Sequence, residues 1–365
     1  MDPGHQHQRR RFVVKHLRTS LLILLALARP ELACTAFLLV SEDILVFGRS
    51  FDWSVDDALV LVNKRGVARS SGSSGPSWVS KFGSVTFNQY GRNSPLGGIN
   101  ERGLVLATLW LDETEHRPPD SVPGIGSLRW VQYQLDNCST VAQVMATDRQ
   151  IRISPGPGSK VHYLVADARG GSAAVEFLGG RPVYHHGKEL PRPVLTNSTC
   201  AESQSSLDRW QEFGGSDPLP DGHSSLARYA RTCLHLDRFD PEDSFPARDY
   251  AFSMLKAVSS ETRTMWSIVY DIPARKVWFR TKRNQELRWI ELDRFNFSGA
   301  TPCRMLDINA RLREDVTTAF TRYTTKANRD LIYRVYRSVG FLRDTPDRIL
   351  DEIARVPEAD RYVGE

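Results

Sequence analysis

The sequence is poor in cysteine, and no two of its cysteines lie close together. It contains five among 365 residues, at Cys34, Cys138, Cys200, Cys233 and Cys303. A zinc site of the usual kind needs Cys or His pairs a few residues apart, so none is expected. With Cys34 set aside, the other four could form two disulfides in an oxidising compartment or remain buried free thiols, and the sequence leaves both open.

The chain also lacks a Gly-rich phosphate-binding loop and an internal repeat. Its net charge is +5, but basic residues are mixed with acidic ones along the chain. Because a nucleic-acid partner needs a clustered basic face, none is predicted. The balance of 25% charged and 41% hydrophobic residues is typical of a soluble globular protein, and 365 residues allow one large domain or two ordinary ones.

Long hydrophobic runs are scarce, and the clearest one lies near the start of the chain. Residues 21–28 are apolar and follow a basic stretch between residues 9 and 18. The run is too short to span a bilayer, which needs about 20 apolar residues, so no stable membrane insertion is expected. Residues 26–28 (Ala-Leu-Ala) have the small-x-small form of a signal-peptidase site. We therefore predict that residues 1–33 are a signal peptide with a short pro-stub, and that the protein is exported to the periplasm or secreted.

Several ways of processing this leader remain open. Cleavage after Ala28 would leave residues 29–33 as a stub, which the protein would then remove from itself. Cleavage directly before Cys34 would place Glu31 where a small residue is expected. A lipoprotein would carry its lipid on Cys34, which then could not act as a nucleophile. Under an ordinary signal peptide, Cys34 would be a buried strand residue. We follow the first interpretation, in which Cys34 becomes the first residue of the mature chain.

The rest of the chain has the pattern of an α+β protein. Short apolar or alternating runs predict strands at 35–40, 44–48, 58–62, 85–88, 104–109, 161–166, 172–177, 182–185, 193–197, 264–270, 275–281 and 287–293. Helical spacing of apolar residues predicts helices at 128–147, 224–236 and 250–258. Many strands, then helices, then strands again indicate a sandwich of facing sheets with helices outside.

The end of the chain has a different pattern. Apolar residues recur at helical spacing over 306–323, 331–342 and 349–356. We predict a main domain over residues 34–300 and a helical C-terminal extension over residues 301–365. The extension would pack on the sandwich or on a second subunit, which leaves a homo-oligomer open.

An N-terminal cysteine would bring its own base to catalysis. An internal thiol has a pKa near 8.5 and needs a neighbouring base, whereas the α-amine of a terminal cysteine has a pKa of about 7.7–8.0 and can take the thiol proton. The hairpin over 35–48 returns Arg49 and Asp52 to the end where Cys34 lies. A carboxylate there can orient the amine, and a guanidinium favours the thiolate by its charge.

Five short motifs appear in a recognisable order. They are Cys34 with Thr35, Gly-Arg-Ser-Phe-Asp-Trp at 48–53, Asn-Glu-Arg-Gly-Leu at 100–104, Val-Leu-Thr-Asn-Ser at 194–198 and Ala-Arg-Tyr at 227–229. Together they resemble the choloylglycine hydrolase family, which includes bile salt hydrolases and penicillin V acylases. The resemblance covers roughly residues 34–295. It implies an N-terminal-nucleophile hydrolase with a four-layer αββα fold and no metal or organic cofactor.

The resemblance also implies roles for individual residues. Cys34 would be the nucleophile and carry the base on its own amine. Arg49 and Asp52 would support the sulfur and the amine. Asn197 would donate a hydrogen bond to the tetrahedral oxyanion, and Arg228 would complete the charged network around the nucleophile.

The substrate side of the site departs from the bile salt hydrolases. Trp110 stands where those enzymes usually have an asparagine, and its indole N–H could donate to the oxyanion or its ring could wall an apolar pocket. With Trp53, it resembles the Gram-negative branch of the family. We expect an apolar acyl group to lie against Phe37, Trp53 and Trp110.

The predicted reaction is hydrolysis of a linear, non-peptide amide in a small-molecule N-acyl amide. Substrates of this kind are penicillin V, N-acyl homoserine lactones and conjugated bile salts. An acyltransferase, which passes the acyl group to an amine, is a related reading. A different class, a secreted non-catalytic binding or scaffold protein on the same fold, also remains open.

Overall fold

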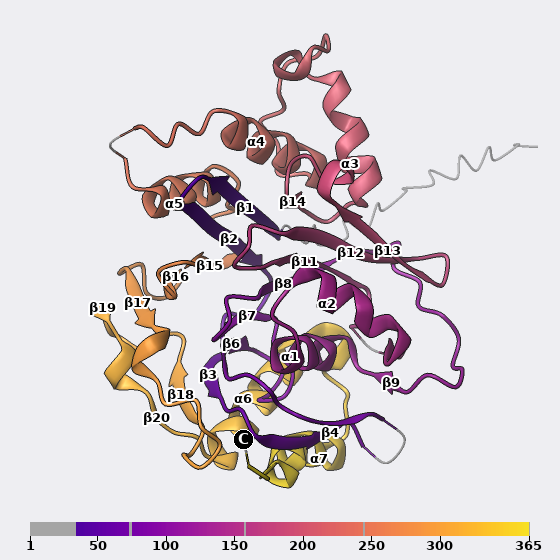
Figure 1. The fold of residues 1–365 in the computed structure, drawn as a ribbon, viewed down its shortest axis with the longest axis vertical. Coiled ribbons are helices and arrows are strands. Elements are labelled where there is room, and N and C mark those ends of the chain that lie inside the picture. The colour runs from indigo at the N-terminus through magenta and orange to yellow at the C-terminus, as the bar shows by residue number, and fades with distance from the viewer. Residues whose placement is uncertain (1–33, 73–74, 157, 244, 365) are drawn as a thin grey trace, which may run out of the picture. The chain divides into compact units, whose positions relative to one another are not determined.

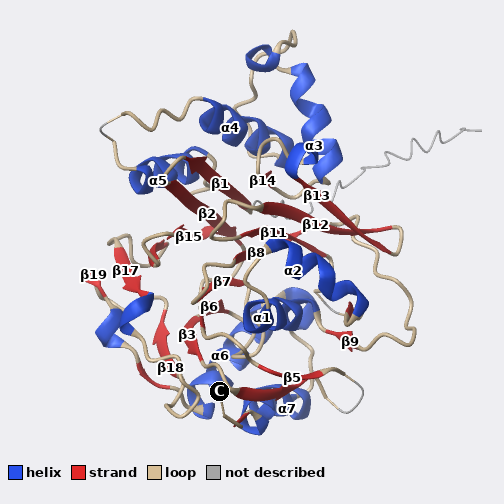
Figure 2. Cartoon of the chain, viewed as in Figure 1, coloured by secondary structure: helices blue, strands red, loops and turns tan. Residues whose placement is uncertain are grey.

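A computed structural model describes residues 34–72, 75–156, 158–243 and 245–364. The predictions made for residues 1–33 therefore lie outside the described part of the chain. Within that part, the chain forms two large β-sheets that carry helices on their outer faces (Figures 1 and 2).

The first large sheet has seven strands and begins with the hairpin that follows Cys34. Its strand order is β14 (Val194–Leu195), β1 (Thr35–Ser41), β2 (Ile44–Asp52), β15 (Thr264–Asp271), β16 (Lys276–Thr281), β17 (Arg288–Glu291) and β19 (Glu314–Asp315). All neighbours are antiparallel except β17 and β19. The strands from the start and the end of the predicted main domain therefore pair directly at its centre.

The second large sheet has nine strands, all antiparallel. Their order is β13 (Arg181–His186), β12 (Ser172–Leu178), β11 (Val161–Ala166), β8 (Val105–Trp110), β7 (Gly97–Asn100), β6 (Ser84–Asn88), β3 (Leu59–Asn63), β18 (Arg304–Asp307) and β20 (Thr321–Arg322). Smaller pairings join β9 (Gly124–Ile125) to β10 (Arg152–Ile153), and join β21 (Arg361–Tyr362), β4 (Val67–Ser70) and β5 (Ser77–Val79).

The alternation of side chains along each strand builds the layers. On β1, Ala36 and Leu38 face the core between the sheets, whereas Phe37 and Leu39 face the outer helices. Those helices are α4 (Ser225–Asp237) and α5 (Ala247–Ala257), and α3 (Cys200–Ser206) packs against α4. The nine-stranded sheet is covered on its outer face by α1 (Ser127–Asn137), α2 (Val141–Ala146) and α6 (Thr325–Ser338). The predicted α+β sandwich with helices outside is confirmed.

One helical prediction needs correction, and one helix was not predicted. The single helix expected over 128–147 is interrupted, because α1 ends before Cys138 and Thr140 caps a new helix by accepting a hydrogen bond from the backbone N–H of Gln143. Helix α3 lies in a polar segment for which no helix was expected. The predicted cap of α4 is confirmed, since the Ser224 side chain accepts from the backbone N–H of Ala227.

The C-terminal extension is helical only in its second half. The helix expected over 306–323 is wrong: this segment forms β18, β19 and β20 with a short 3₁₀ turn. Because β18 pairs with β3, Leu306 enters the core between the sheets and Met305 faces α6. Helix α6 and helix α7 (Asp347–Arg355) follow as predicted.

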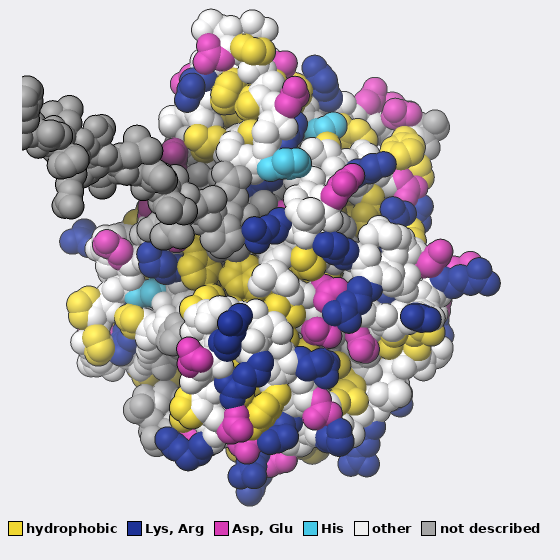
Figure 3. All heavy atoms as spheres, turned by 180° about the vertical axis from the view of Figure 1, so that it is seen from behind, with side chains coloured by type: hydrophobic (Ala, Val, Ile, Leu, Met, Phe, Trp, Pro, Cys, Tyr) yellow, Lys and Arg dark blue, Asp and Glu magenta, His cyan; other side chains and the backbone are white. Residues whose placement is uncertain are grey.

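The described structure also bears on several properties expected from composition. All five cysteines are buried free thiols. None of the described helices is long and apolar enough to cross a membrane. On the face that Figure 3 shows, basic and acidic side chains are interspersed over the surface.

Candidate functional site

Cys34 lies at the end of the first hairpin, next to the strand that returns beside it. It directly precedes β1 and is only 4% exposed. In the antiparallel pairing Thr35 stands opposite Ser50, so the end of β2 reaches the cysteine. The Cys34 Sγ lies 3.5 Å from the backbone nitrogen of Asp52 and 3.7 Å from its carbonyl oxygen. The hairpin thus brings together the residues that the sequence placed at one end of it.

Arg49 is buried beside the sulfur and is tied to the opposite sheet. Its Nη1 donates to the carbonyl oxygen of Leu96 at 2.5 Å, and its Nη2 donates to that of Thr108 at 2.8 Å. Gly97 makes room for the guanidinium, since a Cβ there would lie 2.9 Å from Arg49 Nη1. The charge is therefore fixed in position by backbone oxygens, with no carboxylate among those partners.

The pKa of the Cys34 thiol is raised above its ordinary value. Burial is the main cause and the Asp52 carboxylate adds to it, while Arg49 and Arg228 act in the opposite direction. Within the chain as described, the thiol is therefore mostly protonated at neutral pH. A nucleophilic role needs a base that accepts its proton.

Asp52 is a buried carboxylate with unused acceptor capacity. Burial raises its pKa to about 7, although Thr264, Arg228, Ser50 and Arg49 all act to lower it. Neither carboxylate oxygen meets hydrogen-bond geometry with a partner among the described residues. Buried carboxylates are normally hydrogen-bonded, so this position beside Cys34 can receive a further donor.

Arg228 on α4 connects the cysteine to Asn197. It is buried, and its Nη1 donates to the Cys34 carbonyl oxygen at 2.5 Å and to Thr35 Oγ1 at 2.8 Å. Its Nη2 donates to Asn197 Oδ1 at 2.9 Å. The Asn197 Nδ2 in turn donates to the Trp110 carbonyl oxygen at 2.8 Å. Because a primary amide carries two N–H donors, one remains for a ligand.

The segment that carries Asn197 is held by residues that sequence reasoning missed. The backbone N–H of Asn197 donates to Ser225 Oγ at 2.8 Å, and the Thr196 carbonyl oxygen lies 2.8 Å from His162 Nε2. The other ring nitrogen of His162 lies 3.1 Å from Glu176 Oε1, and both side chains are buried. The sequence could have pointed to this pair, because His162 and Glu176 are titratable residues inside otherwise apolar strands, where a buried charge needs a partner.

Glu176 is the charged member of that pair. Burial tends to raise its pKa, but hydrogen bonds from His162 and His185 lower it to about 2. Both ring nitrogens of His162 face oxygen atoms, Glu176 Oε1 on one side and the Thr196 carbonyl oxygen on the other. The pair fixes the backbone next to Asn197.

A cavity of about 630 Å³ lies beside Cys34. Aromatic rings form one continuous side of it: Phe51 and Trp53 have centroids 6.3 Å apart, Trp53 and Trp110 6.2 Å, and Trp110 and Phe341 6.2 Å. The Trp110 indole N–H is already used, because it donates to Asp112 Oδ1 at 2.9 Å. Of the two roles considered for this residue, the structure therefore favours the ring as part of the cavity wall. No described residues form a group of three or more Cys, His, Asp or Glu side chains that could hold a metal ion.

Phe37 does not reach this cavity, contrary to the sequence-based prediction. It is fully buried among residues that face the outer helices, such as Leu39 and Tyr229. Its ring packs over Gly48, where a Cβ would lie 2.3 Å from the ring. The reason is strand geometry: Phe37 is an odd number of positions from Cys34, so it points to the other face of the sheet.

The C-terminal extension contributes a second group of residues that the sequence did not assign to the site. Six of its apolar side chains line the cavity: Tyr336, Phe341, Leu342, Ile349, Ile353 and Val356. Their helical spacing was interpreted as packing against the sandwich or against a second subunit. Spacing alone cannot separate a packed face from one that borders a cavity.

Comparisons with known proteins point in one direction. A family model described as linear amide C–N hydrolases, choloylglycine hydrolase family, matches residues 34–235. Penicillin V acylase from Pectobacterium atrosepticum is 28% identical over 325 residues, which cover 76% of this chain and 86% of the relative.

Solved structures give the same picture. Penicillin V acylase from Agrobacterium tumefaciens superposes with a TM-score of 0.70 at 27% identity, covering 80% of this chain and 98% of its own. A variant of conjugated bile acid hydrolase from Clostridium perfringens gives a TM-score of 0.63 at 17% identity, covering 77% of this chain and 98% of its own. The latter likeness concerns the fold alone. The higher identity to the acylases agrees with the expected similarity to the Gram-negative branch.

Proposed function

The chain belongs to the choloylglycine hydrolase family of linear amide C–N hydrolases, and from this premise we propose that it cleaves small N-acyl amides with Cys34 as an N-terminal nucleophile. The observation that carries the proposal is the bridge that Arg228 makes between the Cys34 carbonyl oxygen and the Asn197 amide. It fixes the Asn197 amide, which has a spare N–H donor, relative to Cys34, the residue that lines the cavity. A nucleophile and an oxyanion donor must be held in this way for acyl transfer.

The state of Asp52 supports a free amine on Cys34. Neither of its two buried oxygens meets hydrogen-bond geometry with a described partner, although the side chains of Thr264 and Ser50 lie close enough to lower its pKa. Both oxygens lie on the residue whose backbone contacts the sulfur. The nitrogen of Cys34 is an amide nitrogen while residue 33 is attached, and it becomes an amine when that bond is cut. The new amine then has a carboxylate to orient it and can serve as the base.

In the first half of the reaction, the sulfur attacks the substrate carbonyl carbon and the thiol proton passes to the α-amine. The carbonyl oxygen becomes an oxyanion, which accepts a hydrogen bond from the spare N–H of Asn197. The C–N bond then breaks, and the leaving amine takes the proton from the α-ammonium of Cys34. The acyl group is left as a thioester on the sulfur.

In the second half, water attacks the thioester carbon and gives a proton to the α-amine. The C–S bond breaks, the sulfur recovers its proton, and the carboxylic acid leaves. The net change is one amide and one water converted into one acid and one amine. No cofactor enters this scheme.

The ring wall favours an apolar acyl group. Trp53 and Trp110 form adjacent parts of that wall, and aromatic surfaces suit phenyl or hydrocarbon groups. The related acylases carry the name of penicillin V and a relative of lower identity that of conjugated bile acids. We propose phenoxyacyl β-lactams such as penicillin V and N-acyl homoserine lactones as the first substrates to test, with conjugated bile salts as the third.

The leader completes the proposal. Residues 1–28 would direct export to the periplasm or out of the cell, and residues 29–33 would be removed so that Cys34 becomes terminal. Cys34→Ala should abolish hydrolysis, while Cys303→Ala, which removes a buried thiol that does not line the cavity, should retain it. Substantial amide hydrolysis by Cys34→Ala would refute the assignment. Binding of acyl amides without turnover by the unaltered protein would favour the non-catalytic reading instead.

A further inference from the structure

The segment from α6 to residue 356 has apolar side chains that pack on the sheet and apolar side chains that border the cavity. One set of side chains, including Leu331 and Val335, packs against Leu59 and Leu61 of the nine-stranded sheet. Other apolar side chains border the cavity, among them Phe341, which lies in the 3₁₀ turn between the two helices and is 54% exposed. A segment that only stabilises the sandwich needs one apolar face, whereas apolar side chains gathered on a cavity indicate a ligand surface.

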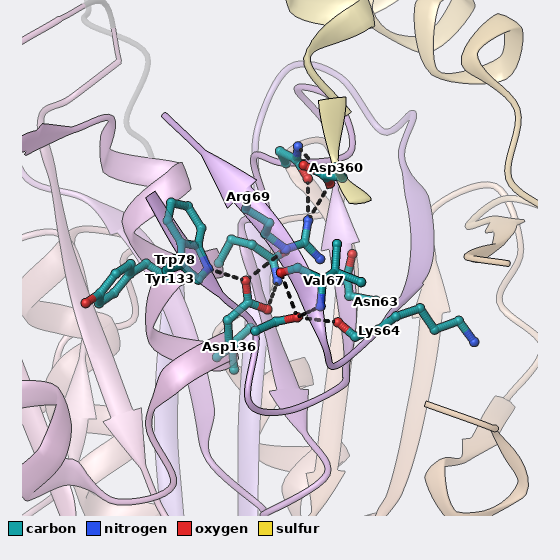
Figure 4. Close-up of polar contacts among 12 residues, drawn as sticks. Asn63, Lys64, Val67, Arg69, Trp78, Tyr133, Asp136 and Asp360 are labelled. Atoms are coloured by element: carbon teal, nitrogen blue, oxygen red, sulfur yellow. Dashed lines mark hydrogen bonds and ion pairs between the residues drawn. The ribbon is translucent and has the colours of Figure 1, made fainter. Parts of the chain in front are cut away.

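This segment is fixed to the main domain by a buried ion-pair group. Figure 4 shows Arg69 of β4 between two carboxylates, Asp360 near the C-terminus and Asp136 of α1. Arg69 Nη1 lies 2.8 Å from Asp360 Oδ2 and Nε lies 3.0 Å from Asp136 Oδ2, and none of the three side chains is more than 4% exposed. The pairing of β21 with β4 adds backbone hydrogen bonds at the same place.

A second buried contact fixes α6 near the cavity. The Asn328 Oδ1 accepts from the backbone N–H of Arg92 at 2.9 Å, and its Nδ2 donates to the Ala354 carbonyl oxygen at 3.2 Å. Arg92 lies in a loop that lines the cavity, so one amide joins that loop, α6 and α7. The apolar side chains of the extension are therefore presented to the cavity in a fixed position.

We propose that this part of the extension sets the length of acyl group that the enzyme accepts. We call the six cavity-lining side chains Tyr336, Phe341, Leu342, Ile349, Ile353 and Val356 the C-terminal wall. The proposal rests on the proposed function and adds to it a determinant of chain length: among amides of unbranched fatty acids, the enzyme prefers those whose far end contacts the C-terminal wall.

The ring series gives the direction of the acyl group. The rings run from Phe51, which precedes Asp52 in the chain, through Trp53 and Trp110 to Phe341 of the C-terminal wall. A carbonyl carbon at Cys34 with its chain along these rings would reach the wall only if the chain is long enough. Each methylene that becomes buried there should raise kcat/KM about fourfold.

A series of N-acyl amides with one common amine and straight acyl chains of increasing length tests this proposal. The unaltered enzyme should show kcat/KM rising with chain length until the wall is covered. Ile353→Trp places bulk in the cavity and should lower the ratio of kcat/KM for dodecanoyl to butanoyl substrate at least tenfold, since excluding two methylenes costs about fourfold each. Glu352→Trp is the matched control, because Glu352 is an exposed neighbour on α7 that does not line the cavity, and it should keep the ratio of the unaltered enzyme.

Phe341→Ala provides a second variant that is not expected to affect folding, since more than half of Phe341 is exposed. It removes a ring from the wall and should also lower the preference for long chains. If both variants keep the chain-length ratio of the unaltered enzyme, the C-terminal wall does not contact the acyl group and the proposal is wrong, although hydrolysis of the series would still support the proposed function. If the unaltered enzyme hydrolyses neither any member of this series nor penicillin V, the proposed function is overturned and this proposal with it.

Discussion

Replacing the buried carboxylate of Asp52 by an amide tests how the terminal amine is held. Two forms of the chain carrying Cys34→Ala provide the comparison. A long form beginning at residue 29 has an ordinary peptide bond before position 34, and a short form beginning at residue 34 has a free amine there. Because neither form has the thiol, neither can process itself, and the two differ at this position only in the amine. Asp52→Asn is then introduced into each.

The magnitude follows from the pKa of Asp52, which burial raises from 3.8 to about 7. Between these values the folded state holds a proton that the unfolded state has lost, so the free energy of unfolding decreases as pH rises through this window. Each pH unit corresponds to 1.36 kcal/mol, so the carboxylate should cost roughly 2–3 kcal/mol between pH 5 and pH 7 in the long form. Asp52→Asn should remove this loss.

In the short form the α-ammonium supplies the missing partner and lowers the pKa of Asp52. The stabilisation by Asp52→Asn should therefore be much smaller there, below about 1 kcal/mol over the same pH range. The measurement is denaturant unfolding of all four proteins at pH 5, 6 and 7. An equal pH dependence of the Asp52→Asn effect in both forms would refute the pairing of the amine with Asp52.

The remaining predictions concern other parts of the site. Asn197→Ala should lower kcat about 10²–10³-fold with little change in KM, because the oxyanion loses a donor that acts in the transition state; an unchanged kcat in steady-state assays would exclude this role. Trp110→Ala should lower kcat/KM for a phenoxyacyl substrate more than for an acetyl one, as measured by amine release, and equal losses would count against the ring as an acyl contact. The pKa of Glu176 is held near 2, below its usual 4.5, so its stabilising contribution, up to about 3 kcal/mol, should be present above pH 4.5 and lost as pH falls toward 2. Acid unfolding of Glu176→Gln should lack that loss, and an acid midpoint equal to that of the unaltered protein would contradict it.

The parts of the site that depend on local geometry were predictable from the sequence. Cys34, Arg49 and Asp52 lie on one short hairpin, and a hairpin of known strand length fixes which residues meet at its end. Asn197 and Arg228 are far from Cys34 along the chain, and only the family resemblance connected them with it. Their contact depends on how α4 packs on the seven-stranded sheet, which no local pattern encodes.

The errors have equally local causes. Phe37 was expected to lie against the acyl group, but the two-residue period of a strand turns it to the outer face. The segment 306–323 has apolar residues at spacings that suit a helix, yet pairing of β18 with β3 satisfies its backbone in the sheet. Tertiary pairing thus outweighed a short helical pattern.

The C-terminal wall shows a further limit of sequence reasoning. The apolar positions of α6 and α7 were predicted as helical, and they are. Whether Ile349 packs in a core or borders a cavity depends on the distance between the two helices and Trp110 across the site. The buried contacts of Arg69 and Asn328 set the position of the helices.

The most direct test of the central claim is the intact mass of the exported, active protein. If Cys34 acts through its own amine, the mass must correspond to a chain that begins at Cys34, and catalytic activity must appear only with that species. Activity in a chain that retains any residue ahead of Cys34, or that bears lipid on its sulfur, would contradict the mechanism.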